Sequence, residues 1–302
     1  MAQITTSTSK FPEELVTQVF NKVKGRSSLA KLSRQTPIPF AGTDQFVFTM
    51  DGEAAIVGEG ANKPAGPADF TPKVIKPIKF VYQHRLTDEF IKMAEEKQIP
   101  YLEAFTSGFS AKMSRALDIA AFHGVNPADN TASAIIGNNN FDAQITGTNV
   151  ITYDANALDE LISDAVGQIQ DADGEVSGIA FSPKAAAALG KIKASGLGTF
   201  LYPEFRFGNN PGSFGGVMSD NNPTVSFGNS PDRVIIGDFE NAFRWGYAED
   251  IPMEIIVYGD PDGLGDLKRM NQIVLRAEAY IGWGILDAAS FAKIAVAETG
   301  NG

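Results

Sequence analysis

The clearest pattern of apolar and polar positions lies in residues 98–124. Apolar side chains recur there at steps of three and four, which places them on one face of a helix. Asp118 falls largely off that face, Pro100 fits the first turn, and His123 precedes a glycine that suits a helix end. We therefore predict one long helix with a single apolar face that another element must cover. The face consists of Leu102, Phe105, Phe109, Met113, Ala116, Leu117 and Ala120.

Shorter apolar runs before and after this helix predict a mixture of helices and strands. Further helices are predicted near the N-terminus, after Thr87, over residues 152–170, and over residues 183–192, where Ser182 and Pro183 form a capping start. The predicted strands cover residues 46–48, 70–82, 176–181, 233–237, 241–247, 253–258, 272–281 and 291–296, with residues 282–284 as a turn. This order of elements indicates the α+β class.

Residues 40–85 are the part of the chain least able to stabilise itself. Two apolar runs flank a tract rich in glycine and proline, and Pro72 and Pro77 exclude a central strand. The segment is therefore predicted to be a long two-stranded ribbon with an irregular tip. Because such a ribbon is marginal alone in water, it must lie on its own domain or on a partner chain.

The closing strands and the long helix both lack a partner layer nearby in the sequence. Pairing residues 272–281 and 291–296 with the helix gives one domain built from both ends of the chain. Residues 150–255 would then form an inserted second domain.

The composition excludes several classes of protein. With 43% hydrophobic and 20% charged residues, the 302-residue chain can bury a sizeable core. Its net charge of −11 argues against a general nucleic-acid binder, and the absence of cysteine removes disulfides and zinc–thiolate sites. No apolar run has the length of a membrane span, and the N-terminus lacks the apolar core of a signal peptide. We expect a soluble protein made in the cytoplasm.

The first 34 residues are locally basic and permit two interpretations. They are either an ordinary N-terminal helix with a mobile tail or an arm that lies on a neighbouring subunit. The sequence does not choose between them.

Candidate chemistry is sparse. His84 and His123 have no second ligand at metal spacing beside them, so both are interpreted as structural. Residues 171–175 and 260–263 resemble the start of a calcium loop, but each lacks the glutamate that completes such a loop. We therefore predict no catalytic, cofactor-binding or metal-binding residues and no enzymatic activity. The basic residues Lys73, Lys76, Lys79 and Arg85 are expected to face solvent or an acidic neighbour.

A chain without cleft chemistry, but with an arm and a ribbon that need support, is typical of an obligate assembly. Four segments follow one another here: LTDEFIKMAEEKQIPYLEAFTSGFSAKMSRALDIAAFHG, IAFSPKAAAALGKIK, RVIIGDFENAFRWGY and QIVLRAEAYIGWGILDAASFAKI. In this order they resemble the major capsid proteins of tailed bacteriophages, which have the Hong Kong 97-type shell fold. Residues 121–124 stand where that family has a segment rich in small residues, and residues 234–239 match its VIFGDF-like strand. The ordered set, which spans nearly the whole chain, carries the resemblance.

The resemblance implies the domain organisation of that fold. It implies an N-terminal arm at residues 1–39, an extended β-hairpin loop at 40–85 and an axial domain at 150–255. A peripheral domain would comprise residues 86–149 and 256–302 and would contain the spine helix at 98–124. Subunit contacts are expected at Arg26, Lys63, Phe70, Lys73 and Lys76.

The resemblance also implies a function. The chain would self-assemble as a homo-oligomer of hexamers and pentamers into the icosahedral virion shell that encloses the DNA genome. A portal would be a partner. Met1 lies too close to the extended loop for an internal scaffold, which implies a separate scaffolding protein as a further partner or assembly without one. Double-stranded DNA would lie nearby without sequence-specific binding, no membrane is expected, and assembly would take place in the host cytoplasm. No lysine matches the family's crosslinking motif, so we predict no covalent crosslinking.

Two other interpretations stay open at this stage. The chain could form the shell of a cellular encapsulin-type nanocompartment, which has the same fold and holds cargo enzymes instead of DNA. It could also be an unrelated α/β enzyme that uses a metal in its acidic loops, which predicts a monomer or a small oligomer.

Overall fold

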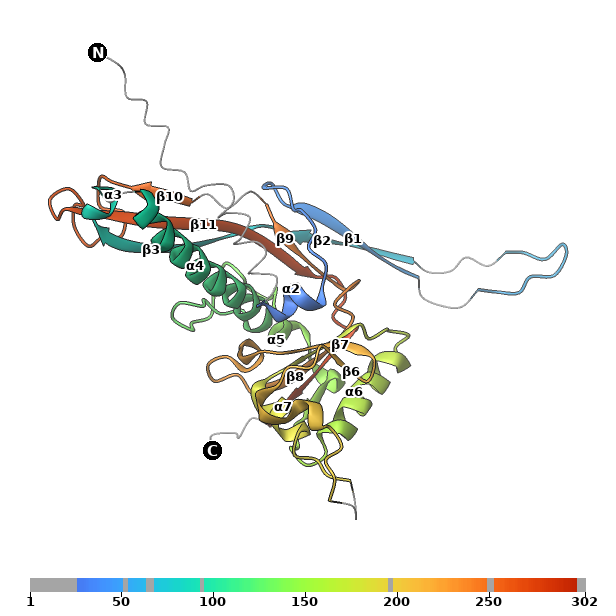
Figure 1. The fold of residues 1–302 in the computed structure, drawn as a ribbon. Helices are drawn as coiled ribbons and strands as arrows, with labels where there is room; N and C mark the ends of the chain where they lie inside the picture. The colour runs from blue at the N-terminus through green and yellow to red at the C-terminus, as the bar shows by residue number, and fades with distance from the viewer. Residues whose placement is uncertain are drawn as a thin grey trace, which may run out of the picture.

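A computed structural model describes residues 26–50, 54–63, 68–92, 95–194, 198–248 and 253–297. The chain forms two lobes, and a hairpin projects from the first of them (Figure 1). One hydrophobic core surrounds helix α4 in the first lobe, and a second core fills the other lobe. The predicted N-terminal helix and most of the basic arm lie outside the described residues.

Helix α4 (Glu95–His123) confirms the predicted long helix. Phe109, Met113 and Leu117 on its apolar face are buried against a four-stranded sheet. In that sheet β11 (Gln272–Ile285) runs antiparallel to β3 (Ile78–Thr87), and it also pairs with β9 (Phe243–Tyr247) and β10 (Met253–Ile256). The predicted cover of the helix by the strand around residues 272–281 is therefore confirmed.

The predicted turn at residues 282–284 is wrong, because β11 continues to Ile285 and pairs there with β9. A Cβ atom on Gly282 would lie 3.0 Å from Ile38 Cδ1, and one on Gly284 would lie 2.8 Å from Ile75 Cγ1. These two glycines do not end the strand. Instead, they let the segments that carry Ile38 and Ile75 pass close over the sheet.

The predicted ribbon is present but shorter than expected. Strands β1 (Thr43–Met50) and β2 (Ala68–Ile75) form an antiparallel hairpin, which extends away from both lobes (Figure 1). Residues 78–85 were expected in the same ribbon, but they belong to β3, which pairs along its whole length with β11. The break falls at Lys76 and Pro77, where the chain leaves the hairpin and enters the sheet.

The second lobe is built on a six-stranded sheet with the order β4-β12-β8-β5-β7-β6. Helices α6 (Leu158–Asp171) and α7 (Pro183–Leu189) bury their apolar sides against it. The predicted start of α7 is confirmed, since the Ser182 hydroxyl accepts a hydrogen bond of 3.3 Å from the backbone N–H of Ala185. The strands are β4 (Val150–Thr152), β5 (Gly178–Phe181), β6 (Ser213–Phe214), β7 (Val217–Asn221), β8 (Asp232–Gly237) and β12 (Phe291–Ala295). The short helices are α2 (Ser28–Leu32), α3 (Glu89–Lys92), α5 (Phe141–Gln144), η1 (Gly147–Asn149), η2 (Pro203–Gly208) and η3 (Pro223–Ser226).

Strand β12 connects the two lobes. Residues 291–296 were expected to cover the long helix, but β12 pairs with β8 and β4 in the second sheet. Its alternate side chains divide between the cores: Phe291 packs in the first, whereas Ala292 and Ile294 pack in the second. Strand β9 is exchanged in the opposite direction. Residues 243–247 were expected in the inserted domain, but they pair with β11 in the first sheet.

Candidate assembly surfaces and buried polar clusters

The end of the hairpin is the most exposed apolar feature among the described residues. Ile56 is fully exposed in the loop that follows β1, and Val57 beside it is 39% exposed. At the base of the hairpin, Ile75 is buried. An apolar tip on a projecting ribbon is a typical docking element, because water contact with such groups is unfavourable.

The residues predicted for subunit contacts do not form one site. Lys63 is exposed near the hairpin tip, Lys73 is half-buried opposite Gln45, and Lys76 is exposed where β2 ends. Phe70 lies in β2 opposite Phe48, and its side chain lies outside what the structure describes. Arg26 is exposed at the distant junction of the lobes, where its carbonyl accepts a hydrogen bond from Asn222. Their role in subunit contacts stays a prediction.

A groove of about 580 Å³ lies between β3, α4 and the segment 126–136. Its rim carries exposed apolar side chains, of which Ile135 is 78% exposed and Val81 and Tyr82 are less so. Lys112 from α4 also lines the groove. The groove is therefore a second exposed surface with apolar side chains, and it lies on the first lobe beside β3.

Asp118 is the centre of a buried polar cluster that the sequence did not predict. Its carboxylate accepts hydrogen bonds from the Ser27 hydroxyl (2.5 Å), the Ser28 N–H (2.9 Å), the Leu29 N–H (3.2 Å) and the Thr224 hydroxyl (2.8 Å). Asp118 thereby satisfies free N–H groups at the start of α2 and fixes both α2 and η3 to the long helix. It lies off the apolar face, as predicted, yet its side chain is fully buried.

Burial also changes the chemistry of Asp118. Burial raises the pKa of its carboxyl group to about 6, although the hydrogen bonds from Ser27, Ser28 and Thr224 act in the opposite direction. Nearby, the Ser28 hydroxyl donates to Asp220 Oδ2 (2.6 Å), and Lys31 pairs with Asp220 Oδ1 at 2.8 Å. Residues 27–31 are therefore held by two carboxylates, one from α4 and one from β7.

A second buried cluster joins the two lobes around His123. At the end of α4, His123 Nδ1 lies 2.8 Å from Asp142 Oδ2, and His123 Nε2 lies 2.9 Å from the Thr224 carbonyl oxygen. Lys293 Nζ on β12 lies 2.9 Å from Asp142 Oδ1 and 3.5 Å from Asp232 Oδ1. Asp232 is fully buried and faces both Lys293 and Asp142. The cluster contains two carboxylates, one ammonium group and one imidazole.

The pKa values of this cluster are strongly linked. Burial alone would lower the pKa of His123, but its hydrogen bond and charge interaction with Asp142 outweigh burial and raise the pKa. Burial and the charge of Asp142 raise the pKa of Asp232 to about 7. Burial would likewise raise the pKa of Asp142, but His123 and Lys293 lower it below its ordinary range. These pKa shifts favour the charged forms of His123, Lys293 and Asp142 and the neutral form of Asp232.

The same cluster has the residue types of a metal site, since ligand atoms of His123, Asp142 and Asp232 lie within 4.8 Å of one another. The donor set does not fit a metal ion well. The Lys293 ammonium already contacts Asp142 and Asp232, and both ring nitrogens of His123 are in hydrogen bonds. The positive charge that a cation would bring is thus supplied by the chain itself. We interpret the cluster as an internal ion-pair group between the lobes.

The His123→Gln variant is expected to lose stability in a pH-dependent way. When the pKa of a histidine is higher in the folded than in the unfolded chain, the histidine stabilises the fold. This stabilisation is complete below the unfolded pKa and is lost as the pH rises through the folded pKa. The variant should therefore be about 2 kcal/mol less stable than the parent at about pH 5.5, and the difference should shrink to less than half at about pH 8.5. Urea unfolding at both pH values measures it. A difference that is constant with pH would show that His123 is not charged in the fold.

The acidic turn at residues 260–263 is held by an arginine. Arg85 Nε donates to Asp262 Oδ2 at 2.8 Å, and its Nη2 donates to Asp262 Oδ1 and to the Gly265 carbonyl oxygen (2.9 Å). The hydrogen bonds from Arg85 lower the pKa of Asp262 to about 2. Arg85 therefore faces an acidic neighbour in its own chain, as does Lys79, which pairs with Glu278 at 2.8 Å. The loop that begins at Asp260 is fixed by this contact.

Sequence reasoning missed both buried clusters, because their partners come from distant parts of the chain. Asp118 and Thr224 are separated by 106 residues, and Asp142 and Lys293 by 151 residues. One local signal was available: Ser27 precedes a short apolar run and is a typical helix cap. No helix among the described residues is both long and apolar enough to cross a membrane.

Comparison with known proteins agrees with these features. Residues 11–296 match the phage capsid family. A solved structure from Mycobacterium phage Ogopogo is 31% identical, with a TM-score of 0.75 over 90% of this chain and 92% of that chain. A structure from Gordonia phage Cozz is 26% identical, with a TM-score of 0.74 over 90% of this chain and 87% of that chain. The capsid of a native GTA particle shares the fold at 13% identity, with a TM-score of 0.64 over 98% of this chain and 95% of that chain. No curated protein matches the chain.

The two lobes, the projecting hairpin and these matches define a shell-forming structural protein. The chain belongs to the phage capsid family. The interpretation as a capsid protein of a tailed phage is thereby confirmed over those of a cellular nanocompartment and an unrelated enzyme.

Proposed function

We propose that each copy is one tile of a closed icosahedral shell around the double-stranded DNA of a tailed phage. The first lobe would be the peripheral domain with α4 as its spine, the second lobe the axial domain, and the hairpin the extended loop. The hairpin carries this proposal, because it projects from the lobes with the exposed Ile56 at its end. A two-stranded ribbon is marginal alone, so a neighbouring copy would cover it.

The partners follow from this arrangement. Copies would group as hexamers and pentamers, with a portal and a separate scaffolding protein as further partners during assembly in the host cytoplasm. The net charge of −11 limits adhesion to the enclosed DNA, since nonspecific binding grows with the number of phosphate contacts. The role of the chain would be structural rather than catalytic, and contacts between copies would be noncovalent.

Replacing Ile56 and Val57 together with serine tests the role of the hairpin. Both side chains are exposed, so the free energy of unfolding should change by less than about 0.5 kcal/mol. Assembly should fall about tenfold or more, because the apolar tip would no longer be buried by a neighbour. Sedimentation and negative-stain microscopy measure the yield of shells. The neighbouring Glu59→Gln variant is the control, and normal yields from the serine variant would contradict the proposal.

A further inference from the structure

The second lobe carries opposite charges on its two helices. Helix α6 packs over β12 and β8, and α7 packs beside it over β8 and β5 and contacts η2 (Figure 1). The two helices share one core, and each leaves an outer side exposed.

The α6 side is acidic. Residues 150–177 contain no lysine or arginine. Among the described residues, none of the exposed carboxylates in this segment forms an ion pair. These exposed carboxylates are Asp154, Glu160, Asp164, Asp171, Asp173 and Glu175.

The α7 side is basic. Lys184, Lys191 and Lys193 are exposed, and none of them pairs with a carboxylate within the described ranges. The Arg206 guanidinium lies 3.8 Å from the ring centroid of Phe200 and 4.7 Å from that of Phe207. Stacking of this kind holds the guanidinium in place while leaving its charge available.

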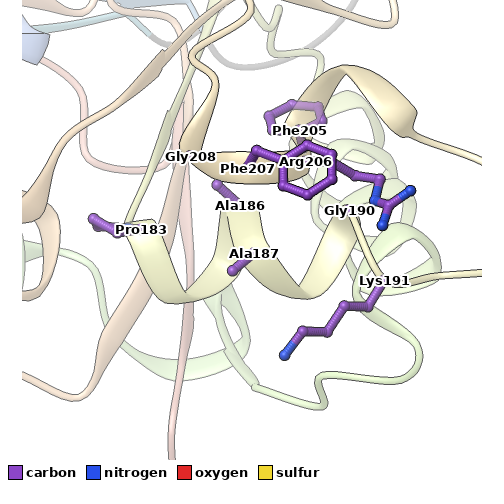
Figure 2. A pocket seen from close by; sticks show the side chains of 9 residues that line it. All are labelled: Pro183, Ala186, Ala187, Gly190, Lys191, Phe205, Arg206, Phe207 and Gly208. Carbon is purple, nitrogen blue, oxygen red and sulfur yellow. The ribbon is translucent and has the colours of Figure 1, made fainter.

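Two of these cations, Lys191 and Arg206, line a hollow of about 320 Å³ (Figure 2). Ala186, Ala187 and Gly190 of α7 form one wall, and the η2 segment with Phe207 forms the other. Phe207 is 95% exposed and has a φ of 60°, which is strained for a residue with a side chain. A strained aromatic ring held in water beside an apolar hollow is a costly arrangement for an isolated chain, and burial in an interface would offset that cost.

We propose that the acidic outer face of α6 in one copy docks on the basic hollow of α7 and η2 in the next copy. The two patches differ, so a contact between them is head-to-tail, and such contacts form a ring when the rotation between copies closes. Opposite charge selects this register, because a copy turned the other way would place like charges together. The inference rests on the proposed function and specifies which surfaces meet when copies of the second lobe surround a common axis.

Charge reversal in the full-length chain tests the contact. The Glu160→Lys/Asp164→Lys variant and the Lys184→Glu/Lys191→Glu variant should each reduce assembly about tenfold or more, because each places like charges in the interface. The chain that carries all four changes should recover assembly. Phe207→Gly should keep or raise the melting temperature, since glycine accepts a positive φ, and should still reduce assembly.

A crosslinking measurement covers the case in which a variant fails to fold. Equal amounts of unlabelled and nitrogen-15 wild-type chain are assembled and treated with a zero-length carbodiimide reagent. Peptides that join Glu160 or Asp164 to Lys184 or Lys191 should appear with mixed labels. Their absence from assembled shells, or shells of normal yield from both reversed variants, would overturn the inference and leave the shell function standing. Normal assembly of the lysine variant with loss of bound DNA would assign the hollow to nucleic acid instead. A wild-type chain that forms no shells even when it is expressed with the other structural proteins of its particle would refute the proposed function as well.

Discussion

Replacing Phe109 with aspartate is expected to abolish folding and, with it, shell assembly. Phe109 is fully buried on the apolar face of α4, where its ring stacks on Phe105 with centroids 6.5 Å apart. Loss of a buried phenylalanine side chain costs about 3–5 kcal/mol, and burial of an unpaired carboxylate adds to this. Together these two costs equal most of the free energy of unfolding of a domain, which is about 5–15 kcal/mol. Calorimetry of the purified variant should show no cooperative unfolding transition.

The control for this variant is Phe109→Leu, which keeps the position apolar. It should cost about 1–2 kcal/mol and still give shells, because the core can close around the smaller side chain. Normal shells from the aspartate variant would show that α4 does not anchor the core of the first lobe.

Replacing Asp118 with alanine should lower the free energy of unfolding by about 2–4 kcal/mol near neutral pH. The change leaves the donors of Ser27, Ser28 and Thr224 buried without an acceptor, at about 1–3 kcal/mol each. An opposing term reduces the loss. The rise of the Asp118 pKa from 3.8 to about 6 means that keeping the carboxylate ionised costs about 3 kcal/mol at neutral pH. Urea unfolding of both chains measures the difference.

The pH dependence identifies the carboxyl group as the cause. A folded pKa above the unfolded value contributes stability that is present at low pH and is lost as the pH rises from 3.8 to about 6. The difference between the parent and Asp118→Ala should therefore be larger at about pH 4.5 than at about pH 7.5. Lys112→Ala, an exposed change on the same helix, should stay within about 0.5 kcal/mol at both pH values. A pH-independent difference would contradict the buried position of Asp118.

The spacing of apolar residues was sufficient to predict the helices that bury one face in a core. The spacing of Phe109, Met113 and Leu117 places them on one side of α4, and Ser182 with Pro183 fixes the start of α7. Glycine was harder to interpret. Gly282 and Gly284 look like a turn in the sequence, but only the fold shows that Ile38 and Ile75 pass over them.

The strand exchange between the lobes could not be predicted from local pattern. In β12, Phe291 packs in one core and Ala292 in the other, so both faces are apolar and the periodicity does not say which sheet the strand joins. The two buried polar clusters could not be predicted from the local sequence either. Asp118 and His123 were interpreted as ordinary helix residues, because their partners Thr224 and Asp142 come close only in the folded chain.

Electron microscopy of the full-length chain, expressed together with the other structural proteins of its particle, tests the central claim most directly. The account predicts uniform closed shells in which the hairpin of each copy lies on the next copy and the second lobes form rings. Under the same conditions, a chain that remains monomeric would contradict it. Shells in which the hairpin tip with Ile56 stays in solvent would also contradict it.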